Sequence, residues 1–421
     1  MSMMRSRRSS LAIRRSPRAG RWSPDSWPNA KVFLVTEPSW SITAAWMSSY
    51  LTVYLVARHA SVTGIGLAIG ISGLLQAAIF PAVGWFSSRI GRKAVIQIGD
   101  VLGWIVAIIL WIVHVPPIWI LIALVLNQVS QVVTPPWNGL FSEDIDAEKR
   151  SHLYLLLQVV TILGGSVVPL FAIWEHRLGI AESGRMAFAI ALPFLALSIG
   201  MRQWLLRESS LERAERTARK TGAWLSTRQR LLPALRGQGR ALAGLRVLAQ
   251  LSFSLFATFA PFSFVEHGGL GIHTNQLAFL PLSSSIFGLA LWLQHRRIGQ
   301  LPPHRSLGLA IAALIVGFGL LGLRAPGGLF TLLGAWGCVM TGQSMFWSSH
   351  TTYWMTWVPD SARVDVQGYV GALAALLITI AAPLLASWSL AHADLFYWGN
   401  FSLAIVLGLL WRSVGRQAQK I

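Results

Sequence analysis

Residues 101–126 read VLGWIVAIILWIVHVPPIWILIALVL, a run without a single Asp, Glu, Lys or Arg. A helix needs about 20 apolar residues to cross the hydrocarbon core of a bilayer. The run falls within two candidate spans, residues 95–116 and 118–139. It therefore predicts an integral membrane protein built from helices.

Similar apolar stretches occur along the whole chain, on both sides of a polar segment at residues 207–241. The candidate spans are 33–57, 63–86, 95–116, 118–139, 153–174 and 186–206, then 243–264, 276–295, 306–324, 327–349, 366–388 and 396–413. We predict an all-α membrane protein with twelve transmembrane helices in two pseudo-symmetric six-helix bundles. The expected units are a basic, disordered tail (1–31), a first bundle (32–206), a basic loop (207–241), a second bundle (242–415) and a short tail (416–421).

The composition excludes a soluble enzyme, because 54% of the 421 residues are hydrophobic and 12% are charged, against about 25% charged in soluble domains. The net charge is +19. If both termini are cytoplasmic, 30 of the 35 Lys and Arg lie on the cytoplasmic side and four on the outer side, as the positive-inside rule requires. We expect anionic lipid rather than nucleic acid as the partner of these charges, a monomer, and a bacterial inner membrane.

Motifs for catalysis, metals or cofactors are missing from the sequence. The single cysteine, Cys338, lies in an apolar stretch and can form neither a disulfide framework nor a cysteine-based metal site. No phosphate-binding Gly-x-x-x-x-Gly-Lys, no Gly-x-Ser-x-Gly and no His cluster occurs. If the protein moves a solute across the membrane, it would use ion or substrate gradients, with H⁺ or Na⁺ as candidate coupling ions, and would need no cofactor.

The two halves share a weak internal repeat. Arg-Ile-Gly follows the second span at residues 89–91 and recurs after the eighth span at residues 297–299, within Arg296 to Gln300. A second similarity between the halves lies at the ends of spans four and ten. Trp137 precedes Glu143, Asp144 and Arg150, and Trp347 precedes Asp360 and Arg363. Many transporters are built from such duplicated units.

The segment GWFSSRIGRK, Gly84 to Lys93, resembles the loop signature of the major facilitator superfamily. That signature reads Gly, three variable residues, Asp, Arg, any residue, Gly, Arg, and Arg or Lys; five of its six defining positions match, and Ser88 stands where the family has Asp. The resemblance implies two six-helix bundles that rock about a midplane site and open it alternately to each side.

The residues of this loop also have a physical reading. Gly84 allows a close helix approach, Gly91 a tight turn, and Arg89, Arg92 and Lys93 face the anionic surface. Glu143 and Asp144 are the expected partners of the two arginines. With Arg150 they complete the candidate gating motif, although ordinary snorkelling and topology-setting charges are the alternative.

Charged residues within spans are costly and are candidates for coupling or substrate binding. Three qualify, Glu37, Asp100 and Arg246. The resemblance implies that spans one, four, seven and ten line a central cavity, and in this sequence these spans contain aromatic and neutral polar residues. The candidate lining residues are Trp40, Trp46, Tyr50, Asn127, Gln128, Gln131, Gln250, Gln343 and Trp347.

Aromatic faces with neutral hydrogen-bonding groups suit an uncharged or amphipathic substrate better than a multiply charged anion. The sequence therefore predicts a secondary active transporter of a small organic molecule, and no enzyme. A polytopic membrane enzyme or a transporter-like sensor is the alternative, and it would place the three charged residues in a lipid-side cleft instead of a central cavity.

Overall fold

The computed structural model describes residues 28–220, 227–265, 271–294, 297–298, 301–323, 328–359, 362–388 and 392–418. The described part is helical almost throughout. It contains no strand. The chain forms two groups of helices, one on each side of the polar segment near its middle.

The first bundle begins at Pro28, slightly before the expected boundary. Its helices are α1 (Pro28–Ala57), α2 (Val62–Ile79) continued by η2 (Phe80–Ala82) and α3 (Val83–Ile90), α4 (Arg92–Asp100) continued by η3 (Val101–Val106) and α5 (Ala107–Ile112), α6 (Pro117–Val129) continued by η4 (Ser130–Val133) and α7 (Thr134–Ser142), α8 (Ala147–Leu163) with η5 (Gly164–Val167), and α9 (Pro169–Leu205). Gly179 breaks α9 with φ 75° and ψ 166°, so its two parts belong to two successive spans.

The second bundle follows the central segment, which is itself partly helical. The central helices are α10 (Ser210–Lys220) and α11 (Thr227–Ala234). The bundle contains α12 (Gln238–Val265), η6 (Thr274–Ala278) continued by α13 (Phe279–Leu293), α15 (Pro303–Gly322), α16 (Gly328–Trp357), α17 (Arg363–Trp388) and α18 (Ala393–Ala418).

Nine helical stretches of the described residues are long and apolar enough to cross a membrane. One of them, His152–Leu205, is 54 residues long and contains the break at Gly179, so it supplies two crossings. The remaining long helices, α1 and α16, have 30 residues each and carry more polar side chains. The arrangement is consistent with the twelve expected spans.

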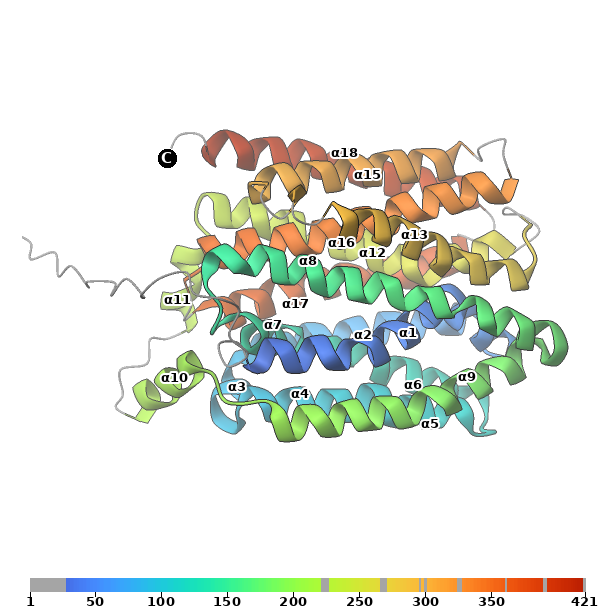
Figure 1. Cartoon of the computed structure of the whole chain (residues 1–421), viewed down its shortest axis with the longest axis horizontal. Coiled ribbons are helices and arrows are strands. Elements are labelled where there is room, and N and C mark those ends of the chain that lie inside the picture. The colour runs from blue at the N-terminus through green and yellow to red at the C-terminus, as the bar shows by residue number, and fades with distance from the viewer. Residues whose placement is uncertain are drawn as a thin grey trace, which may run out of the picture.

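The helices run side by side along the long axis of the molecule, with the first bundle largely below the second in Figure 1. Helices α10 and α11 lie together at one end, where α1 begins and α12 begins. We call this the α10 end and the other the far end.

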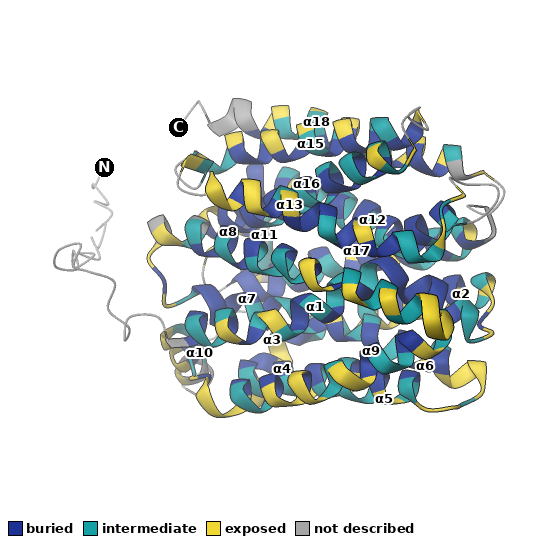
Figure 2. Ribbon diagram, turned by 45° about the vertical axis from the view of Figure 1, so that its right-hand side comes forward, coloured by how far each residue is buried: buried dark blue, intermediate teal, exposed yellow. Residues whose placement is uncertain are grey.

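The outside of the molecule is apolar. Large hydrophobic side chains such as Leu197, Ile380 and Leu384 are more than half exposed, and Figure 2 shows exposed residues scattered over the outer helices such as α4, α5 and α18. In water such a surface would drive association, whereas in a bilayer it contacts lipid. The exterior agrees with an integral membrane protein.

The two bundles meet along α2 and α17 and along α8 and its neighbours α13 and α16. Glycines on α2 allow the closest approach. A Cβ atom at Gly70 would lie 2.9 Å from the Pro383 side chain, and one at Gly73 would lie 2.7 Å from the Ala375 carbonyl oxygen. Small residues in membranes let helix backbones pack in this way, and we call this contact the α2–α17 seam.

Candidate functional site: a central cavity

A cavity of about 680 Å³ lies between the two bundles. Its walls come from α1, α2, α4, α6, α7, α8 and α9 of the first bundle and from α12, α16 and α17 of the second. A volume of this size is in the range of small-molecule sites. The three charged residues singled out from the sequence, Glu37, Asp100 and Arg246, all line it, and none of them lies in a lipid-side cleft.

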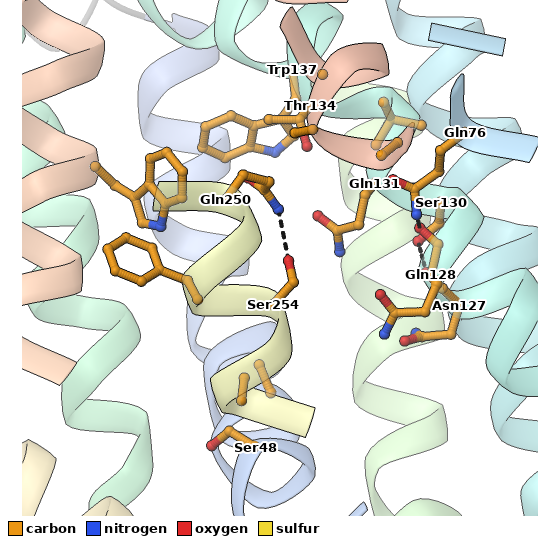
Figure 3. Close-up of a pocket in the computed structure, with 18 of the residues that line it drawn as sticks. Ser48, Gln76, Asn127, Gln128, Ser130, Gln131, Thr134, Trp137, Gln250 and Ser254 are labelled. Carbon is orange, nitrogen blue, oxygen red and sulfur yellow. Dashed lines mark hydrogen bonds between the residues drawn. The ribbon is translucent and has the colours of Figure 1, made fainter. Parts of the chain in front are cut away.

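Neutral amides form the middle of the cavity. Figure 3 shows Gln250 and Ser254 of α12 facing Gln131 across the space, with Gln128 and Asn127 on the same wall as Gln131. The Gln250 Nε2 donates to Ser254 Oγ at 3.1 Å, and Asn127 Nδ2 donates to the Gly103 carbonyl at 2.8 Å.

The second bundle contributes a cation and an aromatic face. The Arg246 guanidinium carbon lies 3.9 Å from the centroid of the Trp347 ring. Phe253 and Phe346 each meet Trp347 edge-on at 5.4 Å, which holds the indole in place. Gln343, another predicted lining residue, lies one turn before Trp347 on α16 and also faces the cavity.

The first bundle contributes a buried charge cluster of Glu37, Asp100 and Arg202. Arg202 lies 3.5 Å from the Glu37 carboxylate and 3.4 Å from that of Asp100. Its Nε donates to Thr36 Oγ1 at 2.9 Å, and its guanidinium stands over Trp40 at 4.7 Å. Two carboxylates thus share one arginine beside the cavity.

Arg202 was not among the candidates chosen from the sequence, because it lies near the end of its span and was counted with the basic loop. A signal was present. Arg202 precedes the expected end of its span, residue 206, by four residues, a depth similar to that of Glu37 and Asp100 in their own spans. Opposite charges at one depth on neighbouring helices indicate a pair.

Trp46 and Tyr50, also predicted to line the cavity, lie elsewhere. Both are buried among the helices of the first bundle. Trp46 stacks on Tyr50 at 5.7 Å and meets Phe188 of α9 edge-on at 4.8 Å. Trp46 therefore packs against α9 within the first bundle and Tyr50 packs on Trp46, whereas Trp40 does line the cavity.

The loop segment Gly84 to Lys93 lies at the α10 end, outside the cavity. Arg92 is buried and forms ion pairs with Glu143 and, at 3.0 Å, with Glu215 of α10. Its backbone N–H donates to Glu212 Oε1 at 2.9 Å. Ser209 donates to Glu143 Oε2 at 2.6 Å and caps α10 by accepting from the Glu212 N–H. The helix that follows the first bundle is therefore fastened to the loop.

The other residues of the candidate gating motif make separate contacts. Arg89 stacks over Trp85 at 4.4 Å and forms no ion pair with Glu143 or Asp144 among the described residues. Asp144 accepts from the Ser210 hydroxyl at 2.8 Å. The remaining contacts are Lys93 Nζ to the Leu206 carbonyl at 3.2 Å and Arg150 Nε to the Ser142 and Ile145 carbonyls at 3.1 and 3.0 Å.

The two glycines of the motif are needed for different reasons, one for its backbone conformation and the other for a close contact. Gly91 has φ 92° and ψ 148°, a backbone region that favours glycine, and it separates α3 from α4. At Gly84, a Cβ atom would collide with the Asp365 carboxylate of α17. Gly84 therefore lets the loop segment touch the second bundle.

Some predicted features fall outside the described residues or side chains. These are the tail to residue 27, Arg296, Gly299 and Gln300 of the repeat, Asp360, and the charges Arg324, Arg416 and Lys420. Within the described chain no group of three or more His, Cys, Asp or Glu is arranged to hold a metal ion.

Comparison with known proteins identifies the family. The sequence model of the Major Facilitator Superfamily matches residues 39–341. This match covers well over half of the chain, and the chain belongs to that superfamily. A comparison of the sequence with curated proteins finds no match.

Solved transporters have the same fold. The human organic anion transporter MFSD10 (TETRAN) is 18% identical, with a TM-score of 0.61 over 93% of this chain and all of that one. A bacterial homologue of the iron transporter ferroportin, in an outward-facing state, is 13% identical, with a TM-score of 0.63 over 92% of this chain and 99% of that one. The nucleoside transporter NupG is also 13% identical, with a TM-score of 0.59 over 92% and 99%. At such identities the likeness shows the fold alone.

Proposed function

We propose that this member of the superfamily is a secondary active transporter of a small amphipathic organic molecule, with the substrate bound in the central cavity. The observation that carries the proposal is the cavity of about 680 Å³ between the bundles, lined from both sides by amides, hydroxyls and aromatic rings. Each bundle supplies part of the binding surface, so a change in their relative tilt would move the substrate's access from one end to the other.

Alternating access needs contacts that can be exchanged at the two ends. At the far end, Thr52 of α1 donates to the Thr258 carbonyl of α12 at 2.6 Å, and Thr274 donates to Glu175 Oε1 at 2.5 Å. At the α10 end, Gly84 lies against Asp365. These are a few polar contacts and close approaches, and a rocking motion can break one set while keeping the other.

The charge cluster is our candidate for ion coupling. Glu37 and Asp100 carry two negative charges against the single positive charge of Arg202, so the cluster can take up one proton and become neutral. Thr161 Oγ1 donates to Glu37 Oε1 at 3.2 Å, and both acids line the cavity, which gives a proton a route from water. H⁺ is therefore the coupling ion that we propose.

The family fits a multi-pass membrane protein. We propose that it lies in a bacterial inner membrane with its α10 end in the cytoplasm. Lys and Arg are concentrated in the segments that connect helices at this end. The positive-inside rule then places it on the cytoplasmic side. Labelling of single cysteines by a membrane-impermeant reagent in intact cells tests the orientation.

The test of the proposed function is transport by purified protein. A thermal-shift screen of small organic molecules identifies ligands, and the strongest are then followed as flux into proteoliposomes with and without a pH gradient. We expect saturable flux that depends on protein and is accelerated by the gradient, with the acceleration lost in Asp100→Asn. Ligands that bind without any flux, in either direction of loading, would contradict a transport function.

A further inference from the structure

Arg246 differs from every other charged residue of the cavity wall in its lack of an opposite charge. Glu37 and Asp100 both pair with Arg202. Arg246 forms no ion pair and no hydrogen bond with any residue in the described part of the chain, and its guanidinium stacks over the face of Trp347. Stacking occupies the flat face of a guanidinium. Its N–H donors lie in the plane of the guanidinium group and stay free to form hydrogen bonds.

This arrangement is costly unless something else supplies the missing partner. A cation removed from bulk water without a counterion destabilises the fold, and stacking on an aromatic ring offsets only part of this cost. Arg246 lies two turns into α12 and lines the cavity, so its free donors point to a partner that enters through the cavity.

Hydrogen-bond donors without acceptors lie on the neighbouring face of α16. The residues Gln343, Trp347, His350 and Trp354 are spaced by four, three and four positions, so they share one side of the helix, and all four line the cavity. The Gln343 Nε2 and Trp354 Nε1 atoms are buried without a hydrogen-bond partner among the described residues. Unsatisfied buried donors of this kind need a ligand or water as acceptor.

The wall also holds an acceptor, because the Nδ1 atom of His350 is buried without a hydrogen-bond partner among the described residues. His350 Nε2 lies 2.9 Å from the Leu242 carbonyl, and because a carbonyl only accepts, Nε2 must be the donor. No carboxylate of the described chain pairs with Arg246. The wall therefore offers one full positive charge, two neutral donors and one neutral acceptor, beside the apolar faces of Phe253 and Trp347.

From this chemistry we propose that Arg246 binds the acidic group of the substrate, and that the substrate is an amphipathic organic monoanion with a flat apolar part. A carboxylate matches the planar fork of an arginine, while the aromatic faces of Trp347 and Phe253 receive the apolar part. The inference rests on the proposed function and makes its substrate more specific. The second anionic charge of a dianion would have no cationic partner on this wall.

The test compares acids with their neutral counterparts. Benzoate, 1-naphthoate and indole-3-acetate are matched with the corresponding primary amides, and binding to the purified protein is followed by thermal shift and by quenching of tryptophan fluorescence. We expect at least one acid to bind and its amide to bind at least about tenfold more weakly, because hydrogen bonds to a charged group contribute more than neutral ones.

Variants separate a binding arginine from a structural one. Arg246→Gln should remove the preference for the acid, and Arg246→Lys should retain part of it because the charge remains. The matched control is Arg240→Gln, a residue of the same helix that is exposed and does not line the cavity; it should bind the acids as the wild type does. Without ligand, Arg246→Gln should melt at the same temperature as the wild type or higher, since an unpaired cation has been removed.

The outcomes are distinct from those of the transport test. Equal binding of acids and amides, binding of neither series, or an acid preference that persists in Arg246→Gln would overturn the anion site while leaving the transport function open. If the acids bind through Arg246 and are not carried across proteoliposomes, the anion site stands and the transport function fails.

Discussion

Beside the cavity, Arg202 pairs with the carboxylates of Glu37 and Asp100. We predict that Arg202→Gln lowers the free energy of unfolding by about 3–5 kcal/mol, because both Glu37 and Asp100 are then left without their cation in a buried site. Chemical denaturation of the protein in detergent measures the change. Adding Glu37→Gln and Asp100→Asn to the variant should restore most of the stability. A triple variant no more stable than Arg202→Gln would show that the charges are independent.

This network also marks the limit of prediction at the residue scale. Glu37, Asp100 and Arg246 stood out in the sequence because they are charges within apolar runs, and they do line the cavity. The sequence could not show that Arg202 binds two of them and that Arg246 remains without an ion pair within the described chain. Those facts depend on how α1, α4, α9 and α12 are rotated about their axes, which apolar patterning in an almost uniformly apolar helix does not determine.

At the scale of elements, α10 is the part most open to regulation by pH. Burial raises the pKa of the Glu215 carboxyl from 4.5 to about 7; Glu143 and Asp365 add to the rise, and Arg92 opposes it. When α10 leaves its site, Glu215 is exposed and the pKa returns toward its usual value. Between about pH 4.5 and pH 7 the docked helix binds more protons, so its docking weakens as the pH rises through this window.

Hydrogen exchange of the α10 amides tests this prediction. After correction for intrinsic rates, the wild type should show less protection at about pH 8 than at about pH 5. In Glu215→Gln the protection should not change with pH, since the titrating group is gone. An unchanged pH dependence in that variant would assign the effect to a different acid.

The packing at the α2–α17 seam predicts that replacing Gly73 by alanine costs much more stability than replacing Gly200. Gly73→Ala places a methyl group 2.7 Å from the Ala375 carbonyl oxygen and 3.1 Å from the Thr379 nitrogen. Since both are backbone atoms, the helices must separate, and we expect a loss of stability of about 1–3 kcal/mol, typical of overpacking. Gly200→Ala on α9 is the control, because a Cβ atom there meets nothing within 4 Å. Equal melting temperatures of the two variants would show that close packing at the seam does not contribute to stability.

Helix positions were largely predictable, because long apolar runs reveal spans directly. The central segment was expected as a basic loop, yet it contains α10 and α11. Their residues are strongly charged, so hydropathy gave no sign of them. A local cap at Ser209 starts α10, and tertiary contacts of Glu212 and Glu215 with Arg92 hold the helix in place.

At the scale of the whole molecule, the two-bundle architecture follows from the duplicated pattern of spans and from the family match over residues 39–341. The cavity lies between the two bundles, and seven of the nine residues predicted to line it do so. Trp46 packs against Phe188 of α9 instead, and Tyr50 stacks on Trp46. A role in substrate binding stays a prediction for the residues that line the cavity. Helical periodicity alone could not distinguish the side of α1 that faces the cavity from the side that packs within the bundle.

Distances between spin labels in lipid vesicles show whether the two bundles open the cavity alternately at its two ends. With Cys338 replaced by Ala, one labelled pair at Lys149 and Arg305 spans the α10 end, and a second pair at His114 and Leu323 spans the far end; all four residues are exposed. We predict two populations of label-to-label distances at each end. Adding a ligand or changing the pH should lengthen the distance within one pair and shorten the distance within the other. A single unchanging distance at both ends, or distances that lengthen together, would contradict alternating access.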